Sequence, residues 1–418
     1  MTAETHPTRD NLARMALPPL VEPSAPLSVQ EIERYARHVL IPDVGMQGQR
    51  RLKNARVLVV GAGGLGSPAL MYLAAAGVGT IGVADADVVE LSNLQRQVIH
   101  AADDVGRLKS ESAAQALASV NPWVRVVRHD VRLDASNALQ IIAGYDLVVD
   151  GTDNFPTRYL LNDACVLLDK PDIWGSIYRF DGQASIWWAR HGPCYRCVFP
   201  QPPPPGQVPS CGEGGVLGVL CAAVGSVQAA EAVKLIVGIG DPLVGRLMVH
   251  DCLRQSWDVL TVHRDPQCAV CGQSPTVTDL VDYEAFCSVT ELGGAAVAGG
   301  ALTAAAGVAV PRISALELAD LLSGGDTPGV LLVDVRGAQE REIAAIPGAS
   351  AIHLDEFRSG AAVRQVPFDR PVVIFCRVGV RSEEASRLLI EAGHPDVRTL
   401  AGGVLAWVRD VDPAQPGY

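Results

Sequence analysis

The chain is 418 residues long, 48% of them hydrophobic and 19% charged, and carries a formal net charge of −12. This length predicts at least two domains, because single hydrophobic cores stop growing well below it. The acidic balance argues against nucleic acid as a partner.

Targeting signals and membrane spans are not indicated. The N-terminus has no basic stretch followed by an apolar core, so no secretory signal is expected. The long uncharged stretch 292–310 consists mostly of Ala and Gly and is too weakly hydrophobic to insert into a membrane. Ten cysteines in such a chain favour metal ligands and reactive thiols over a disulfide framework, and they predict a cytoplasmic protein.

The order of predicted elements indicates an α/β protein with two domains. Residues 1–26 form a disordered tail, and residues 27–272 alternate between strands and helices like a doubly wound, Rossmann-like domain. A flexible linker follows at residues 273–310, and its last part is rich in Ala and Gly. A smaller α/β domain then covers 311–418. The strands are expected at 57–60, 80–83, 147–149, 330–333 and 372–375, and the helices at 67–76, 110–120, 315–322 and from 382 onward.

A glycine-rich loop follows the first predicted strand and opens the next helix. Its glycines are Gly61, Gly63, Gly64 and Gly66, and Asp85 ends the second strand nineteen residues later. Glycines let a phosphate approach the backbone, the helix N-terminus favours its charge, and the acid can bind ribose hydroxyls. The motif predicts a nucleotide site, which a dehydrogenase would also contain.

Polar residues beyond Asp85 favour ATP over a nicotinamide. Ser92, Asn93 and Gln97 supply hydrogen-bonding groups, and Arg96 and Lys109 supply positive charge suited to a triphosphate.

A further strand ends at Gly151, just before Asp153 and Asn154. The carboxylate of Asp153 can hold Mg²⁺, a hard cation that prefers oxygen ligands. Together with the preceding residues, these side chains favour nucleotidyl transfer over hydride transfer.

Four cysteines form two closely spaced pairs that predict a structural zinc site. Cys194 and Cys197 make one pair, and Cys268 and Cys271 make the other. Four thiolates at this spacing suit tetrahedral zinc with no open position for catalysis. A redox pair is the alternative, but it would not need a second copy.

A long loop carries another cysteine. Residues 199–215 include four consecutive prolines and so form neither a helix nor a central strand. Such a loop inside a domain indicates a lid or crossover segment. Cys211 lies in it, and from residue type alone an incidental surface thiol explains Cys211 equally well.

A cysteine near the C-terminus begins a tight strand-to-helix loop, 376–382. Backbone N–H groups, a helix N-terminus and the nearby Arg377 and Arg381 favour a thiolate at Cys376. The loop can therefore hold a negatively charged sulfur, including the terminal sulfur of a persulfide.

Residues 32–272 resemble the MoeB/ThiF family, relatives of ubiquitin-activating enzymes that adenylate the C-terminal glycine of small ubiquitin-like proteins. The resemblance implies that the polar residues named above bind ATP, with Asp153 on the metal. It also implies a homodimer in which Arg37 reaches the nucleotide of the neighbouring subunit. Arg96, Lys109 and Mg²⁺ would neutralise charge as a carboxylate attacks the α-phosphate. The matching stretches are 34–37, 61–66, 85, 92–97, 109 and 152–154.

Residues 311–412 are similar to a rhodanese domain. The six residues from Cys376 to Arg381 match the loop length of sulfurtransferases, whereas phosphatases on this fold use one residue more. An inactive docking module is the alternative. Family members that carry this second domain form a covalent bond between a crossover-loop cysteine and the activated carrier, which implies such a role for Cys211. The matches are 331–336, 346–349, 353, 376–382, 400–403 and 407.

The resemblance implies a two-step enzyme. The first domain adenylates a ubiquitin-like sulfur-carrier protein, and Cys376, loaded by thiosulfate or by a cysteine desulfurase, then supplies sulfur for a carrier thiocarboxylate. Molybdenum cofactor biosynthesis is one pathway that needs this chemistry. The alternatives are activation for conjugation through a Cys211 thioester, and a non-enzymatic scaffold that docks carriers.

Overall fold

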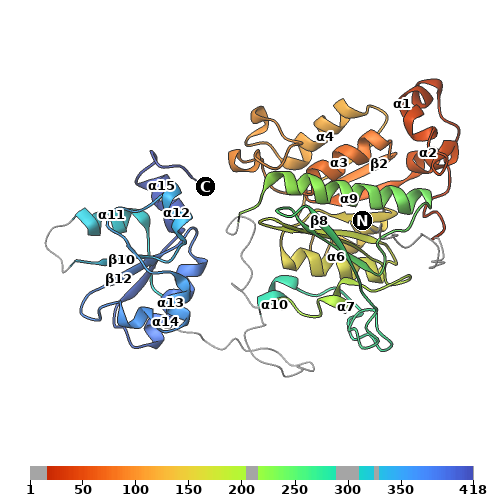
Figure 1. Cartoon of the computed structure of the whole chain (residues 1–418). Helices are drawn as coiled ribbons and strands as arrows, with labels where there is room; N and C mark the ends of the chain where they lie inside the picture. Colours follow the sequence, from red (N-terminus) through yellow and green to blue (C-terminus); the bar gives the residue numbers. More distant parts are fainter. Residues whose placement is uncertain (1–16, 204–214, 289–309, 324–328, 418) are drawn as a thin grey trace, which may run out of the picture. The chain divides into compact units, whose positions relative to one another are not determined.

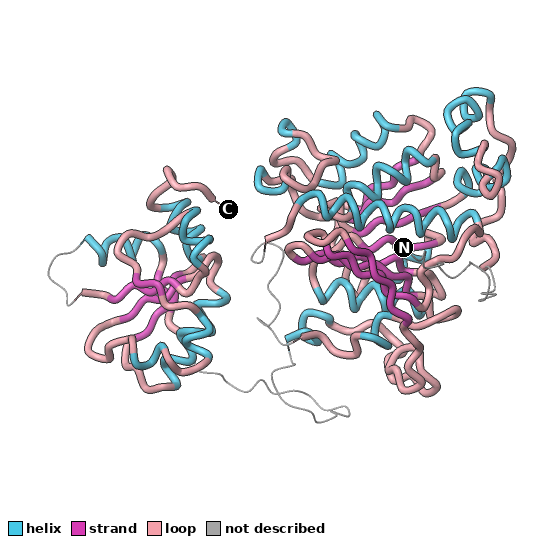
Figure 2. Tube along the Cα trace, viewed as in Figure 1, coloured by secondary structure: helices cyan, strands magenta, loops and turns pink. Residues whose placement is uncertain are grey.

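The computed structural model describes residues 17–203, 215–288, 310–323 and 329–417. The chain divides into two compact units, residues 1–294 and 295–418. Each unit contains one sheet with helices on both faces (Figures 1 and 2). The predicted α/β class, with a doubly wound first domain and a smaller second one, is confirmed.

The first unit is built on an eight-stranded sheet. Its strands are β1 (Arg56–Val60), β2 (Thr80–Ala84), β3 (Arg125–His129), β4 (Leu147–Asp150), β5 (Asp172–Tyr178), β6 (Asp181–Trp187), β7 (Arg246–Asp251) and β8 (Ser256–Thr261). Their order is β3-β2-β1-β4-β5-β6-β7-β8, parallel from β3 to β5 and antiparallel beyond. The chain reverses direction of travel across the sheet between β1 and β4, and ligands of doubly wound folds bind at such a switch point.

Helices cover both faces of this sheet. They are α1 (Val29–Val39), α2 (Gly45–Asn54), α3 (Gly66–Ala76), α4 (Lys109–Val120), α5 (Ala138–Ala143), α6 (Phe155–Leu167), α7 (Tyr195–Val198), α9 (Gly218–Val237) and α10 (Tyr283–Ser288), with short 3₁₀ turns η1 (Leu91–Asn93) and η2 (Ala102–Asp104). Helices α3, α4 and α9 enclose one hydrophobic core, and α5, α6 and α10 enclose the other (Figure 1). The central strands β1 and β4 are apolar almost throughout because both of their faces are buried.

Helix α9 is the one helix of the described chain that is long and apolar enough to cross a membrane. It packs against α3 and β5, and Leu220, Val224 and Leu235 lie in the core of the first unit. A Cβ atom at Gly225 would lie 2.5 Å from the Pro68 ring, so glycine allows α9 and α3 to approach closely. The composition of α9 is therefore that of a core helix.

The N-terminal segment 17–26 is packed, although the sequence places it in a disordered tail. Leu17 and Leu20 lie against the first core, Val21 is buried, and the Leu20 N–H donates to the Leu235 carbonyl at 2.9 Å. The apolar side chains of this segment find partners on α9, more than two hundred residues away, which local composition does not reveal.

The segment after residue 272 also belongs to the first unit, where the sequence predicts a flexible linker. The Tyr283 hydroxyl donates to the Asp163 carboxylate at 2.7 Å, and Phe286 contacts the Tyr159 ring. Arg196 donates twice to Asp163, at 2.9 and 2.7 Å, and both charged side chains are at least 95% buried. Helix α10 is therefore anchored to a buried ion pair. The rest of the predicted linker, 289–309, lies outside the described residues.

The second unit has a five-stranded parallel sheet. Its strands are β9 (Arg312–Ile313), β10 (Leu331–Asp334), β11 (Ser350–Ala351), β12 (Val372–Phe375) and β13 (Val397–Leu400), in the order β11-β10-β12-β13-β9. The helices are α11 (Ala315–Ser323), α12 (Ala338–Ile343), α13 (Leu354–Arg358), α14 (Val380–Glu391) and α15 (Gly403–Asp410), with a 3₁₀ turn η4 (Ala362–Arg364). Helices α11 and α15 pack together, as do α13 and α14, around two cores.

The buried ion pair predicts a large effect of one substitution. Arg196→Met should lower the free energy of unfolding of the first unit by about 3–5 kcal/mol, because it leaves the Asp163 carboxylate buried without its cation. Urea unfolding of the full chain, followed by tryptophan fluorescence, measures the change.

The matched control is Arg190→Met. Arg190 pairs with Asp169 at 2.8 Å, but both side chains are largely exposed, so the expected loss is at most about 1 kcal/mol. Equal losses for the two variants would show that the buried pair does not anchor this region.

Candidate functional site

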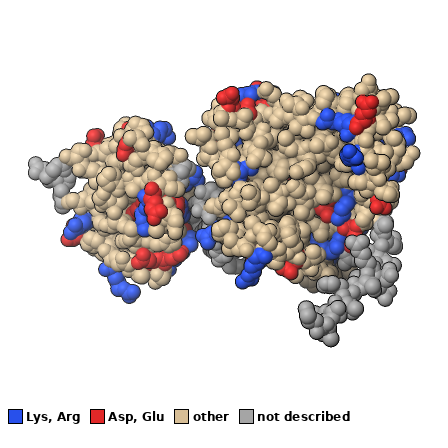
Figure 3. Space-filling view, turned by 45° about the horizontal axis from the view of Figure 1, so that its top comes forward, with Lys and Arg blue, Asp and Glu red and all other residues tan. Residues whose placement is uncertain are grey.

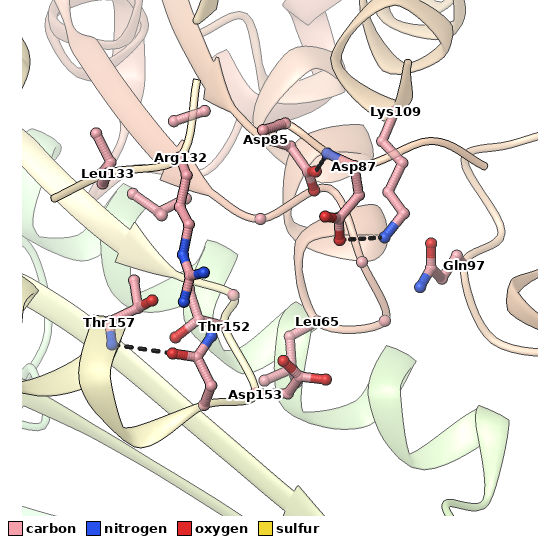
Figure 4. Close-up of a pocket in the computed structure, with 18 of the residues that line it drawn as sticks. Leu65, Asp85, Asp87, Gln97, Lys109, Arg132, Leu133, Thr152, Asp153 and Thr157 are labelled. Carbon is pink, nitrogen blue, oxygen red and sulfur yellow. Dashed lines mark hydrogen bonds and ion pairs between the residues drawn. The ribbon is translucent and has the colours of Figure 1, made fainter. Parts of the chain in front are cut away.

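A cavity of about 380 Å³ lies at the carboxyl ends of β1, β2 and β4. The glycine loop forms one wall of this cavity. Asp85, after β2, and Asp153, after β4, also line it (Figure 4). This position is the switch point of the sheet, where several strand ends and a helix N-terminus meet.

Glycine is required at two positions of the loop for steric reasons. A Cβ atom on Gly66 would lie 1.8 Å from the Gly61 carbonyl oxygen, and one on Gly64 would lie 2.8 Å from the Cys221 sulfur. Gly61 itself has a φ of +88°, in the left-handed region. The loop can therefore pass tightly from β1 into α3, whose N-terminus then faces the cavity and favours an anion.

Asp85 is held by the backbone on both of its oxygens. Its Oδ2 accepts the Ala62 N–H at 2.8 Å and its Oδ1 accepts the Asp87 N–H at 2.9 Å. Burial raises the pKa of Asp85, partly offset by the charge of Lys109 and by these hydrogen bonds. Lys109 itself extends into the cavity and pairs with Asp87 at 3.0 Å (Figure 4).

The loop after β4 is shaped by Asp150. Its Oδ1 accepts the Thr152 N–H at 2.8 Å and the Thr152 hydroxyl at 2.6 Å. Asn154 then caps α6 by accepting the Thr157 N–H at 3.0 Å. Asp153 lies between these two fixed points and lines the cavity, so its carboxylate is placed by its neighbours.

Two arginines of the cavity were not found from the sequence. Arg132 follows β3, extends toward the cavity and pairs with Glu284 of α10 (Figure 4). Arg158, on α6, is buried, donates to the Thr152 carbonyl at 3.2 Å and lies 5.7 Å from the Trp174 ring centre. With Lys109 and Arg96 they place four cations in the cavity lining, beside the carboxylates of Asp85, Asp87 and Asp153, and cations at this position suit phosphate groups. Arg132 follows the end of β3 by three residues, a position that could have indicated it, whereas Arg158 lies within α6 and no local signal indicates it.

The structure brings most of the predicted nucleotide residues together. The predicted residues that are found in the cavity lining are Gly61, Gly63, Gly64, Asp85, Arg96, Gln97, Lys109, Asp153 and Asn154. Gly66 shapes the turn behind it. Asn93 closes the η1 turn by accepting the Glu90 N–H at 3.1 Å, and Ser92 lies exposed beside it. Arg37 is exposed on α1 and does not line the cavity of its own chain. Cys211 lies outside the described residues.

The four predicted zinc cysteines converge in a separate cluster. Cys194 lies 3.8 Å from Cys197 and 3.6 Å from Cys268, and Cys197 lies 3.3 Å from Cys271, measured between sulfur atoms. All four sulfur atoms lie within 4.8 Å of one another. Tetrahedral Zn–S bonds of about 2.3 Å place sulfur atoms about 3.8 Å apart, so the four-cysteine cluster fits structural zinc. Zinc there would join the α7 region to the chain after β8.

The Cys376 loop is a compact turn at the end of β12, with the cysteine sulfur directed at a backbone N–H group. The Gly379 N–H donates to the Cys376 sulfur at 3.1 Å, and Gly379 has a φ of +122°. Helix α14 starts at the next residue, so its N-terminus faces the same sulfur. A Cβ atom on Gly403 would lie 2.5 Å from the Cys376 carbonyl oxygen, which explains the glycine pair at 402–403 that supports the loop.

Arg381, one of the two arginines expected near Cys376, forms an ion pair. Arg381 donates to both oxygens of Glu340 on α12, at 2.8 and 2.7 Å. Although burial opposes ionisation, these bonds hold the pKa of Glu340 below its usual value. The guanidinium therefore fixes α12 beside the loop, and the Gly379 N–H and the N-terminus of α14 are the backbone groups placed to stabilise a negative sulfur.

On the face shown in Figure 3, basic and acidic side chains of the described residues are scattered among uncharged ones.

These features define an α/β nucleotide-binding unit with a four-cysteine cluster, followed by a unit with a cysteine-centred anion loop. Residues 35–270 match the ThiF family, and residues 314–410 match the rhodanese-like domain. The chain belongs to the ThiF family and carries a C-terminal rhodanese-like domain, as the sequence motifs predict.

Relatives with known names share this architecture. The chain is 52% identical over 408 residues to the probable adenylyltransferase/sulfurtransferase MoeZ of Mycobacterium tuberculosis, covering 96% of this chain and 99% of the relative. It is 42% identical to the adenylyltransferase and sulfurtransferase MOCS3 of Aedes aegypti, covering 94% and 90%. A sulfur carrier protein adenylyltransferase of Thermus thermophilus is 57% identical over 265 residues, covering 62% of this chain and 98% of that protein.

Solved structures support the fold of the first unit. A crystal structure of Escherichia coli MccB with MccA-N7isoASN aligns with a TM-score of 0.53 at 23% identity, covering 59% of this chain and 76% of that one. ATP use by this chain fits its membership of the ThiF family.

Metal analysis tests the cysteine cluster. The purified chain is expected to contain about one zinc ion per molecule, and Cys271→Ser should lose it because only three thiolates remain. Cys252→Ser, at a cysteine outside the cluster, should leave the zinc content unchanged. A wild-type chain without zinc would exclude a zinc-binding role for the cluster.

Proposed function

We propose that the first unit adenylates the C-terminal glycine of a ubiquitin-like sulfur-carrier protein, and that a persulfide on Cys376 then converts the activated glycine to a thiocarboxylate. The observation that carries this proposal is the joining, in one chain, of a cation-lined nucleotide cavity and a sulfurtransferase-length cysteine loop. Full-length relatives named adenylyltransferase/sulfurtransferase support it.

The first step is an attack of the glycine carboxylate on the α-phosphate of ATP, which releases pyrophosphate and leaves an acyl-adenylate. The glycine loop and the α3 N-terminus bind phosphate oxygens, and Arg96, Lys109 and Arg132 neutralise the charge that develops. Asp85 is placed to bind the ribose hydroxyls. Asp153 would hold Mg²⁺, which adds further positive charge at the phosphates.

A homodimer is part of the proposal. Arg37 is exposed on α1 and lies outside the cavity of its own chain, so it can act only on the nucleotide of another subunit. A second chain that presents its α1 to the cavity would supply this guanidinium to the phosphates.

Cys211 is proposed to hold the activated acyl group as a thioester. Four residues after it, the chain is anchored near the cavity: the Gly215 carbonyl accepts the Arg179 N–H at 3.3 Å, and the next residue, Val216, lines the cavity. Four extended residues span at most about 14 Å. This chain length allows the Cys211 thiol to approach the adenylate.

Sulfur transfer then follows by thiol chemistry. The terminal persulfide sulfur on Cys376 attacks the thioester carbon, which frees the Cys211 thiolate and gives an acyl-disulfide. That thiolate attacks the Cys376 sulfur, releases the carrier thiocarboxylate and leaves a Cys211–Cys376 disulfide, which a cellular thiol reduces. The covalent link between the two units keeps their thiols at high effective concentration.

The cellular setting follows from this chemistry. The reactions consume ATP and require reduced thiols, so we place the protein in the cytoplasm. The sulfur donor is thiosulfate or the persulfide of a cysteine desulfurase, and molybdenum cofactor biosynthesis is one pathway that such a carrier serves. Conjugation of a ubiquitin-like protein would need no sulfurtransferase loop, which favours thiocarboxylate formation over that alternative.

Exchange between ATP and labelled pyrophosphate tests the adenylation step. The full chain should catalyse exchange only when a sulfur-carrier protein is present, and Asp153→Asn or Arg96→Ala should slow it by about 100-fold or more, because each removes charge stabilisation at the phosphates. A scaffold that only docks carriers would show no exchange in the wild-type chain.

The Cys376→Ala variant tests sulfur transfer separately. It should retain carrier-dependent exchange but yield no thiocarboxylate, which intact-mass spectrometry detects as a gain of about 16 Da when oxygen is replaced by sulfur. Thiocarboxylate formation by Cys376→Ala, with thiosulfate as the sulfur source, would remove Cys376 from the reaction.

A further inference from the structure

A buried histidine lies directly behind the glycine loop of the first unit. The Nε2 atom of His100 lies 2.9 Å from the Ala62 carbonyl oxygen, and its Nδ1 lies 2.8 Å from the Ser112 hydroxyl. The Ser112 hydroxyl in turn lies 2.7 Å from Oδ2 of Asp104. His100 is only 7% exposed and does not line the cavity, so it acts through the loop.

The contact with Ala62 sets the direction of an N–H group in the cavity wall. The C=O and the next N–H of a trans peptide unit point in opposite directions. Holding the Ala62 carbonyl toward His100 therefore turns the Gly63 N–H away from His100, toward the cavity that Gly63 lines. The Ala62 N–H is held as well, by Asp85.

The chain of contacts needs one more proton than a neutral imidazole provides. A carbonyl oxygen only accepts hydrogen bonds, so Nε2 must carry a hydrogen atom toward Ala62. When His100 is neutral, its Nδ1 atom is a hydrogen-bond acceptor, and so is the Asp104 carboxylate. The Ser112 hydroxyl contacts both of them but has only one hydrogen atom to donate. Only the doubly protonated ring lets Nδ1 donate to Ser112 while Ser112 donates to Asp104.

We propose that His100 is a positioning residue for the phosphates of the nucleotide, and that its imidazole takes up a proton when the triphosphate binds. The inference rests on the proposed function, because it requires a nucleotide in the adjacent cavity. A protonated ring also strengthens the Gly63 N–H as a donor, since hydrogen bonds in a chain polarise one another.

The charges around His100 explain why the proton arrives with the ligand. In the free protein, burial and then the charge of Lys109 lower the pKa of His100, while the hydrogen bond to Ala62 and the charges of Asp104 and Asp85 act in the opposite direction. The net shift disfavours the imidazolium, and a neutral ring leaves one of the two Ser112 contacts without a hydrogen atom. A triphosphate adds negative charge on the far side of the loop and neutralises Lys109, which favours the imidazolium. Three charged groups act directly on His100: Asp104 in η2, Lys109 on α4 and Asp85 after β2. Two of these have partners of their own, because Arg107 pairs with Asp104 and Asp87 pairs with Lys109.

Isothermal titration calorimetry measures this proton directly. Mg²⁺-ATP is titrated into the full chain at about pH 7, without a carrier protein, in several buffers that differ in ionisation enthalpy. The dependence of the binding enthalpy on the buffer gives the number of protons taken up. The wild-type chain should take up a proton in part or in full. His100→Gln keeps a donor for the Ala62 carbonyl but cannot titrate, so it should bind within about threefold of the wild-type Kd while losing this uptake.

Two further variants make the result specific. His129→Gln is the matched control: His129 contacts the Tyr145 hydroxyl at 2.7 Å, away from the glycine loop, and should leave the uptake unchanged. Ser112→Ala should reduce the uptake, because it breaks the link from the imidazolium to Asp104. Protonation of the nucleotide itself is common to all four chains and cancels in the comparison.

The outcomes separate this inference from the proposed function. Nucleotide binding with equal proton uptake in the wild-type chain and in His100→Gln overturns the inference and leaves the proposed function standing. A loss of affinity in His100→Gln without a change in uptake would mean that His100 only supports the fold, and it also overturns the inference. A wild-type chain that binds no nucleotide overturns both.

Discussion

The close contact between Gly61 and Gly66 is the constraint on which the rest of the first unit depends. The Gly61 carbonyl lies where a side chain on Gly66 would have to be, so β1 can pass into α3 within a single tight turn. Gly151, after β4, packs against the same turn: a Cβ atom on Gly151 would lie 3.0 Å from the Gly66 nitrogen. The strand ends and the helix N-terminus therefore meet, and they create an anion site made mostly of backbone.

Buried polar side chains hold this backbone in place. Asp85 and His100 bind the two ends of the Ala62 residue, and Asp150 shapes the loop that carries Asp153. None of these contacts is strong by itself, but each fixes a peptide plane that faces the cavity. The outer arginines and Lys109 then add charge to a frame that is already oriented, which is the arrangement that electrostatic catalysis requires.

The two units use one structural device for two anions. In each unit a parallel strand ends in a glycine-containing loop that leads into a helix N-terminus, at the Gly61 turn for the proposed phosphate and at Cys376 for the proposed persulfide. Glycine permits a close approach in each unit: Gly66 packs against the Gly61 carbonyl, and Gly403, at the start of α15, packs against the Cys376 carbonyl. Because activation of the acyl group and delivery of sulfur both stabilise negative charge, one chain can join them with the same local geometry.

The sequence by itself determined the features whose chemistry lies in a short stretch: the glycine loop, the paired cysteines and the loop from Cys376. Within each stretch the residue types and spacings are sufficient, because neighbours in the chain are neighbours in space. The meeting of Cys194 with Cys268, 74 residues apart, was predicted instead from the four ligands that structural zinc requires. Only the tertiary structure decided which distant groups meet. Arg132 reaches the cavity from β3 and pairs with Glu284, the segment after 272 packs on the Asp163–Arg196 pair, and His100 meets Ala62. The partners are far apart in the sequence: 33 residues separate Asp163 from Arg196, 38 separate Ala62 from His100, and 152 separate Arg132 from Glu284. No local pattern therefore encodes their contact.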